Sequence, residues 1–101
     1  MAGNPHDVII IGGGAAGLTA AIYTLRKQLA TVVVSPETGG ATALSNWVEN
    51  YPGANAMAGL ELMGQFAAQV AALGTPIVSA KVTAIQPGRL FQVTLDNGKI
   101  L

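Results

Sequence analysis

Three glycines near the amino terminus are the residues whose spacing points most directly to a chemical role. Gly12, Gly14 and Gly17 form the pattern G-x-G-x-x-G, directly after an aliphatic run and before a run of helix-forming residues. In such a turn the first glycine lets a strand bend into a helix, the second leaves room for a pyrophosphate, and the third lets the helix pack on the strand. The phosphates would meet free N–H groups at the positive end of the helix dipole. The motif therefore predicts a dinucleotide site, with Gly13 as an unconstrained position.

Two other interpretations of this stretch are open. A glycine-rich turn between a strand and a helix can have a purely structural role. Residues 8–25 also carry no charge and are long enough for a membrane span. Consecutive glycines and the polar Thr19, Tyr23 and Thr24 make this a poor lipid-facing helix, and Asp7 stands where a signal peptide would carry positive charge. We therefore expect a nucleotide site and no membrane insertion.

Composition narrows the possible classes of protein. Half of the 101 residues are apolar and a tenth are charged, which is more apolar surface than so small a domain can bury by itself. The excess indicates a chain that is covered by further protein or by a cofactor. A formal net charge of zero gives no attraction to nucleic acid or anionic lipid. The lack of cysteine excludes disulfides and cysteine redox chemistry within these residues, and without a targeting signal a cytoplasmic location is expected.

The elements that would position the glycines follow one another as strand, helix and strand. Residues 8–11 form a β-branched run typical of a strand buried on both faces, residues 15–29 have helical periodicity, and residues 31–34 form a second buried strand. A right-handed crossover would join the two strands. The rest predicts a helix over 59–73, a third parallel strand over 77–79, and an antiparallel meander of 81–85, 90–95 and 99–101. The fold class is α/β: a Rossmann-like βαβ unit with a parallel sheet plus a β-meander, truncated in its last strand.

Several local features refine this outline. Residues 1–5 are expected to be a disordered lead-in, and residues 41–58 an irregular, functional connection. Gly74 would end the later helix. Its predicted apolar stripe consists of Leu60, Met63, Phe66, Ala67, Val70 and Leu73.

The end of the second strand is where a nucleotide-binding unit usually carries an acid for the ribose hydroxyls. Ser35 stands there and offers a hydroxyl, while Glu37 would reach a ribose if the loop bends back, or would be a solvated charge. Pro36 and the pair Gly39 and Gly40 predict a tight loop that approaches phosphate or ribityl oxygens. The lone histidine, His6, is expected to be a surface residue, and no metal site is predicted.

The sequence resembles the FAD domain of the low-molecular-weight thioredoxin reductases, a family of pyridine nucleotide-disulfide oxidoreductases. The resemblance covers nearly the whole chain: DVIIIGGGAAGLTAAIYTLR (7–26), the paired glycines 39–40, VENYPG (48–53), GLELMGQFAAQVAALG (59–74) and the meander. VENYPG is its most discriminating part, because the glycine motif alone fits any flavoprotein that binds two dinucleotides.

This resemblance implies FAD as the cofactor and assigns residues to it. The pyrophosphate would lie along the glycine turn, the ribose and ribityl chain near the end of the second strand, the isoalloxazine near the long connection, and the adenine against the start of the meander. Two positions depart from the family, which often has proline at Ala15 and has a cofactor-binding Gln at Ala41. The implied cofactor residues are Gly12, Gly14, Ala15, Ala16, Gly17, Ser35, Glu37, Gly39, Gly40, Ala41, Ser45, Asn50 and Val82.

The resemblance also implies what these residues lack. The family's nicotinamide-binding domain, with its Cys-x-x-Cys, and its last flavin-binding segment would lie beyond Leu101. Residues 1–101 are thus expected to be a partial FAD/NAD(P)-binding domain, the N-terminal part of a longer flavoprotein, with no catalytic residue and no activity alone. The longer protein would use NAD(P)H, form a homodimer and pass electrons to a disulfide or other acceptor, such as a thioredoxin-like partner. The alternative is a stand-alone NAD-binding module, which Ser35 and VENYPG make less favourable.

Overall fold

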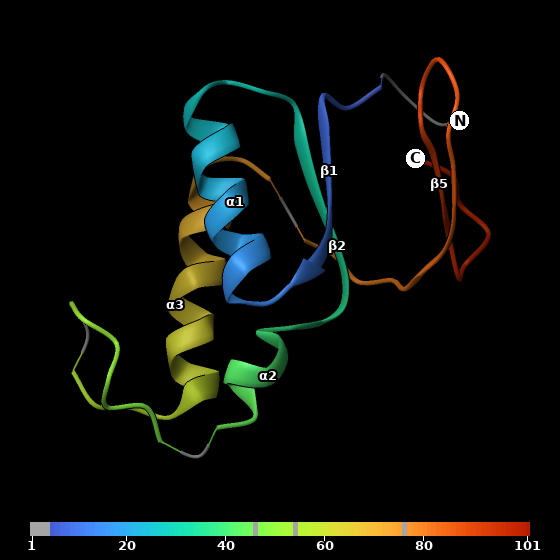
Figure 1. Ribbon diagram of the computed structural model, residues 1–101. Helices are drawn as coiled ribbons and strands as arrows, with labels where there is room; N and C mark the ends of the chain where they lie inside the picture. The colour runs from blue at the N-terminus through green and yellow to red at the C-terminus, as the bar shows by residue number, and fades with distance from the viewer. Residues whose placement is uncertain (1–4, 46, 54, 76) are drawn as a thin grey trace.

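A parallel sheet, two long helices and a separate antiparallel hairpin make up the chain in its computed structural model (Figure 1), which describes residues 5–45, 47–53, 55–75 and 77–101. The lead-in expected over residues 1–5 lies, except for Pro5, outside these described residues. In chain order the elements are β1 (Val8–Gly13), α1 (Ala15–Arg26), β2 (Thr31–Thr38), α2 (Gly40–Ala43), α3 (Gly59–Ala72), β3 (Ile77–Val78), β4 (Val82–Gln86) and β5 (Gln92–Leu95).

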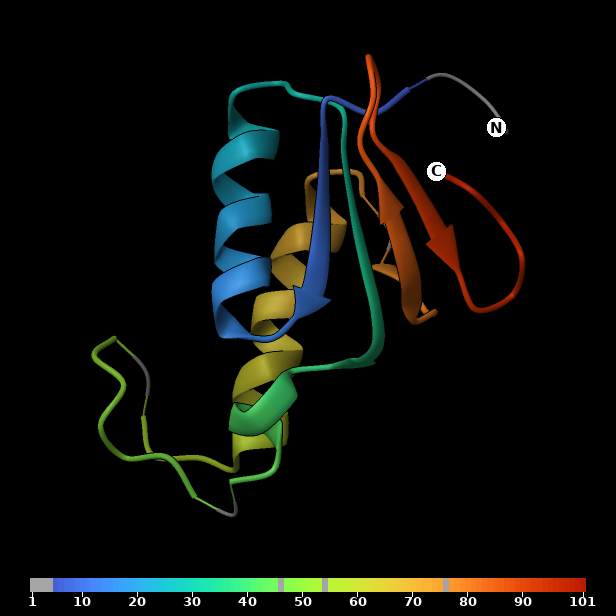
Figure 2. The same cartoon turned by 45° about the vertical axis from the view of Figure 1, so that its right-hand side comes forward.

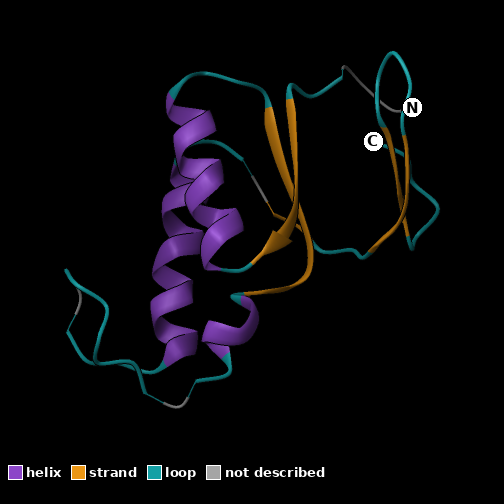
Figure 3. Cartoon of the chain, in the orientation of Figure 1, coloured by secondary structure: helices purple, strands orange, loops and turns teal. Residues whose placement is uncertain are grey.

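The parallel sheet has the order β1-β2-β3 and forms the middle layer. Helices α1 and α3 cover one of its faces and the β4–β5 hairpin covers the other (Figure 3). Successive side chains of a strand point to opposite faces, so Val33 packs toward the helices while Val32 and Val34 pack toward the hairpin. Because β2 is buried on both faces, its residues 31–34 are all β-branched. The parallel pairing of β1 with β2 and of β2 with β3 confirms the predicted βαβ unit.

Helix α1 ends at Arg26, three residues before the predicted end. Gln28 adopts a left-handed conformation with φ of 61°. Its N–H donates to the Leu25 carbonyl at 2.9 Å, and the Leu29 N–H donates to the Thr24 carbonyl at 3.1 Å. This pair of hydrogen bonds is the Schellman arrangement, which glycine usually provides. The sequence offered no glycine there, so the prediction extended the helix too far.

Helix α3 has the predicted extent to within one residue, and Gly74 follows it with φ of 98°, as a helix-ending glycine should. Four residues of the predicted apolar stripe lie in the core, since Met63 and Val70 are buried and Phe66 and Ala67 pack against a buried cluster. Leu62 is also buried, whereas Leu60 and Leu73, at the two ends of the predicted stripe, are 69% and 42% exposed. The periodicity of an alanine-rich helix does not fix the limits of the buried stripe. Contacts of Phe66, Ala67 and Val70 with α1 and the sheet fix these limits.

The meander has the predicted order of segments but forms a sheet of its own. Strands β4 and β5 pair antiparallel, and the last residues fold back on β5. Val93 and Leu101 exchange N–H to carbonyl hydrogen bonds of 3.1 and 2.8 Å, so the predicted third segment pairs with β5 although only one isolated bridge, Thr94 to Ile100, represents it. Neither α1 nor α3, nor any other helix in the described residues, has the length and apolar character needed to cross a membrane.

A candidate dinucleotide cradle at the carboxyl ends of β1 and β2

The turn between β1 and α1 requires glycine at two positions for reasons internal to the chain. Gly12 has φ of 116°, a conformation that side chains rarely adopt. A Cβ at Gly17 would overlap the carbonyl oxygen of Gly12, so the first turn of α1 packs directly on the end of β1. These are the tasks that the motif predicts for its first and third glycines.

Gly14 has no such internal reason to be glycine. Its backbone is extended, with φ of −82° and ψ of −169°, which any residue can adopt. A Cβ built there would meet only the Gly40 Cα at 3.9 Å and the Gly39 carbonyl oxygen at 4.0 Å, which are ordinary contacts. Gly40 faces it from the other turn, with φ of 53° and a virtual Cβ 3.4 Å from the Gly14 Cα. The two glycines leave a cradle without side chains, as the close approach of an external group would require.

Backbone donors point into this cradle from the start of α1. The first intrahelical hydrogen bond runs from Leu18 N–H to the Gly14 carbonyl at 3.0 Å, so the N–H groups of Ala15, Ala16 and Gly17 have no partner within the helix. Gly14, the N-cap residue, has no side chain to satisfy them, and the first turn carries no acidic residue. The positive end of the helix dipole is thus left for an anion from outside.

Gly13, predicted to be an unconstrained position, is in fact constrained by its surroundings. It is buried, and a Cβ there would lie 2.9 Å from the Cβ and 3.1 Å from the Oγ of Ser35. Its carbonyl accepts the N–H of Gly39 at 2.6 Å. Gly13 therefore holds the end of β1 against the end of β2. Only the pairing of the two strands reveals this, because Gly13 and Ser35 are far apart in the sequence.

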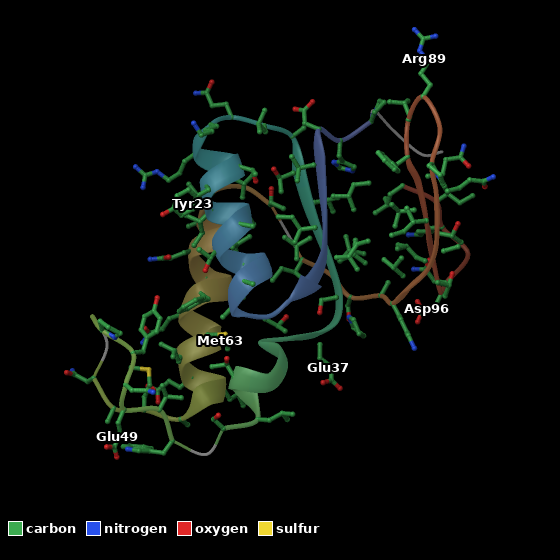
Figure 4. All side chains as sticks on the ribbon, viewed as in Figure 1. Tyr23, Glu37, Glu49, Met63, Arg89 and Asp96 are labelled. Carbon is green, nitrogen blue, oxygen red and sulfur yellow. The ribbon has the colours of Figure 1, made fainter. Side chains whose placement is uncertain are left out.

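The tight loop predicted from Pro36, Gly39 and Gly40 begins later than expected, because β2 runs through Pro36 to Thr38. Gly39 and Gly40 do form a turn there, with φ of 101° and 53°. Ser35 is buried and its hydroxyl donates to the main-chain carbonyl of Glu37, so this O–H is engaged within the strand. Glu37 is exposed, and its side chain points away from the sheet at the end of β2 (Figure 4). Of the two residues considered for the ribose, only Glu37 presents its polar group to solvent.

The second glycine pair is held in place by α3. A Cβ at Gly39 would lie 2.8 Å from the Cβ of Met63, which is buried on α3. Gly59, the first residue of α3, packs so closely on α2 that a Cβ would overlap the Thr42 carbonyl oxygen. Neither α2 nor these contacts were predicted from the sequence. The glycines at positions 39 and 59 are the features of the sequence that could have indicated close packing here, but they do not identify Met63 and Thr42 as the residues contacted.

The remaining predicted cofactor residues lie on elements that follow the two glycine turns in the chain. Ala41 belongs to α2. Ser45 lies where α2 meets α3, and its carbonyl accepts the Gly59 N–H at 3.0 Å. Val82 begins β4, opposite Leu95.

Asn50 is exposed on the loop closed by the Val48–Met57 bridge, apart from the glycine turn. Figure 4 shows its neighbour Glu49 at the lower left and Glu37 below the end of β2. Tyr51 anchors this loop to α3 by an edge-to-face contact with Phe66, with ring centroids 5.5 Å apart. The structure thus brings the residues of the two glycine turns together and leaves Asn50 outside that group.

The arrangement is suited to binding rather than to bond-making chemistry. It offers backbone N–H groups, the end of a helix dipole and space beside two glycines. The chain contains no cysteine that could act as a redox nucleophile. A pyrophosphate, which is anionic and needs close backbone contact, fits these features.

Comparison with known proteins supports the same conclusion. The profile of a family described as FAD binding domain matches residues 7–77. Thioredoxin reductase from Treponema pallidum is 40% identical over 96 residues, which are 92% of this chain and 31% of that protein. A Bacillus subtilis protein named NADH dehydrogenase is 33% identical over 98 residues, which are 96% of this chain and 19% of that protein. The solved thioredoxin reductase of Lactococcus lactis gives a TM-score of 0.88 at 32% identity, covering 96% of this chain and 32% of that chain.

The chain belongs to the FAD binding domain family, whose profile covers more than half of it. Within that family it has the fold of the FAD domain of thioredoxin reductases, as the resemblance predicted. It spans about a third of the length of the thioredoxin reductases that it matches.

Proposed function

We propose that this chain binds FAD as part of a thioredoxin reductase-like flavin oxidoreductase and that its own task is to hold the flavin. The observation that carries the proposal is the cradle between Gly14 and Gly40, where no contact with the described residues requires glycine at position 14. The first N–H groups of α1, which have no partner within the helix, follow directly after Gly14. When bound, the flavin supplies the redox chemistry, and the protein supplies binding and orientation.

Each part of the cradle has a distinct role in this proposal. The N–H groups of Ala15, Ala16 and Gly17 would bind the pyrophosphate, and Gly12 shapes the turn that presents them. Gly39 and Gly40 would let the ribityl side pass close to the backbone. Glu37, rather than Ser35, would reach the ribose, because the Ser35 hydroxyl is engaged by the Glu37 carbonyl.

Three further residues are proposed at the edges of the cofactor. The backbone of Val82, at the start of β4, would meet the adenine. Ser45 and Asn50 would lie near the isoalloxazine, with Ala41 leaving one polar contact unfilled. Because Asn50 is exposed on the loop outside the cradle, its role requires that this loop approach the flavin.

The activity of a whole protein built on this domain is a wider proposal. Residues 1–101 would be a partial FAD domain that later residues complete, and reduced nicotinamide would pass electrons through the flavin to a disulfide or another acceptor. NAD(P)H, a thioredoxin-like partner, a homodimer and a cytoplasmic location belong to that longer form. The chain alone, which has no cysteine, would not reduce disulfides.

A titration distinguishes this proposal from a stand-alone NAD-binding module. Flavin fluorescence or equilibrium dialysis would measure the affinity of the chain for FAD and for NAD⁺. The same titration would use Gly14→Ala, and Gly64→Ala as the matched control, since Gly64 is exposed on α3 and a virtual Cβ there has nothing within 4 Å. We expect FAD to bind more tightly than NAD⁺, with FAD binding about tenfold weaker in Gly14→Ala, equivalent to about 1.4 kcal/mol.

Three results would contradict the proposal. NAD⁺ binding as tightly as FAD would favour the alternative module. Equal FAD affinity in Gly14→Ala and Gly64→Ala would show that the glycine turn does not approach the cofactor. No FAD binding at millimolar concentration, by the longer protein that includes this chain and whose folding is verified by circular dichroism, would remove the flavin assignment.

A further inference from the structure

Strands β1 and β2 are not paired evenly at their carboxyl ends. Ile11 lies opposite Val34 and Gly13 lies opposite Thr38, so residues 35–37 of β2 face a single residue of β1. Within the described part of the chain, residues 35–37 have no paired residue on β1 or on β3. Figure 2 shows the last part of β2 swinging away from β1 and turning back below its end to enter α2. The carboxyl end of β2 is therefore a bulge beside the cradle, and bulges often turn a side chain toward a functional site.

Ser35 closes this bulge from within. Its hydroxyl donates to the main-chain carbonyl of Glu37, two residues further on, and Pro36 between them has no N–H to donate. Ser35 is only 6% exposed, so water competes little for its hydroxyl. The hydrogen bond thus fixes the direction in which the chain leaves Ser35 and, with it, the position of Glu37.

The Ser35 side chain also lies against the first glycine turn. A Cβ built on Gly13 would lie 2.9 Å from the Ser35 Cβ, 3.1 Å from its Oγ and 3.5 Å from the Glu37 carbonyl oxygen. The Gly13 carbonyl in turn accepts the Gly39 N–H at 2.6 Å. Ser35 therefore contacts the turn between β1 and α1 on one side and holds Glu37 on the other, immediately before the second glycine turn.

We propose that Ser35 is a positioning residue, whose hydroxyl holds the bulge in the conformation that directs Glu37 toward the cofactor. This inference rests on the proposed FAD site, in which Glu37 reaches the ribose. The Glu37 side chain is exposed and points away from the sheet, so packing does not hold it in place (Figure 4). Its main chain is held instead, by the Ser35 hydroxyl. The ribose contact of Glu37 then depends on a residue that does not itself touch the ribose.

A double-mutant cycle on FAD affinity tests this role in the longer protein that includes this chain. Glu37→Ala removes the contact with the ribose, and Ser35→Ala removes only the hydroxyl. Because hydrogen bonds to a carboxylate are stronger than those between neutral groups, we expect Glu37→Ala to weaken FAD binding about tenfold. Ser35→Ala should weaken it by about three- to tenfold, but should have no further effect when combined with Glu37→Ala. Two residues that act through one contact are non-additive in this way.

Thr75 offers a matched control at the opposite end of β2. Like Ser35 it is 6% exposed, and its hydroxyl donates to the main-chain carbonyl of Thr31 at 3.1 Å. Thr75→Val removes this hydroxyl. We expect it to lower the stability measured by urea unfolding, as Ser35→Ala does, and to leave the affinity for FAD unchanged.

Ser35→Cys is the second variant at the positioning residue. A thiol has nearly the size of the hydroxyl but is a weaker donor, so the loss of FAD affinity should be smaller than in Ser35→Ala. Circular dichroism verifies the fold of each variant. If Ser35→Ala does not fold, Ser35→Cys with and without Glu37→Ala decides the question.

Each contrary outcome has a distinct meaning. An equal loss of affinity from Ser35→Ala with and without Glu37→Ala, or an equal loss in Thr75→Val, would overturn the positioning role in favour of a purely structural one. Unchanged FAD affinity in Ser35→Ala or in Glu37→Ala would also overturn it. In all these cases the FAD site stands if Gly14→Ala still weakens binding. Failure of the unaltered longer protein to bind FAD would remove the FAD site, and the positioning role with it.

Discussion

Alanine substitutions at the adjacent Gly13 and Gly14 should affect different properties of the chain: Gly13→Ala its stability, and Gly14→Ala its affinity for FAD. Gly13→Ala places a Cβ 2.9 Å from the Ser35 Cβ, a separation that real side chains essentially never show. Ser35 is buried in the central strand and cannot easily move. Strands β1 and β2 must therefore separate, and overpacking of this kind costs about 1–3 kcal/mol. We expect Gly13→Ala to destabilise the fold by that amount.

Gly14→Ala should be neutral or slightly stabilising. Its φ of −82° and ψ of −169° suit alanine, and the new Cβ meets nothing closer than 3.9 Å. Removing a glycine also lowers the entropy of the unfolded chain, which stabilises the fold by about 0.4–1 kcal/mol. The same Cβ would occupy the space between Gly14 and Gly40, so FAD binding should weaken about tenfold. The larger side chain in Gly14→Val should weaken it further.

Two measurements on each variant separate these effects. Urea unfolding without cofactor gives the change in the free energy of unfolding, and FAD titration gives the change in affinity. If Gly13→Ala is as stable as the unaltered chain, the contact with Ser35 does not constrain the strands. If Gly14→Ala binds FAD as well as the unaltered chain, the cradle is not the binding site.

Three more predictions concern other parts of the chain. Gly64→Ala, in the exposed middle of α3, should stabilise the fold by roughly 0.5–1 kcal/mol in urea unfolding, and no change would mean that α3 is frayed there. Gln28→Gly should raise the free energy of unfolding by roughly 0.5–1 kcal/mol, because glycine adopts the left-handed conformation of this residue without strain. Gln69→Gly, within α3, should lower the free energy of unfolding by about 1 kcal/mol. If both substitutions change stability in the same direction, the Schellman assignment is wrong. The chain alone should bind FAD more weakly than about −8 kcal/mol, since each helix-end contact contributes only about 0.3–1 kcal/mol, and submicromolar affinity by fluorescence titration would refute this account.

The sequence by itself determined the βαβ unit and the position of its glycine turn. An aliphatic run, three spaced glycines and a helical periodicity all lie within a short stretch, so local preference and pattern were sufficient. Gly12 and Gly17, which are five positions apart in the sequence, shape the turn by packing against each other. Such short-range contacts can be predicted from the sequence because both residues belong to the same motif.

Only the tertiary structure decided how the two turns face each other. The pairing of β1 with β2 brings Gly13 against Ser35 and Gly14 against Gly40, and neither pair can be recognised without the strand register. The limits of the buried stripe of α3, which includes Leu62 and leaves out Leu60, depend in the same way on its contacts with α1 and the sheet. These features could not be predicted because they depend on residues distant in sequence, whose proximity is created by packing.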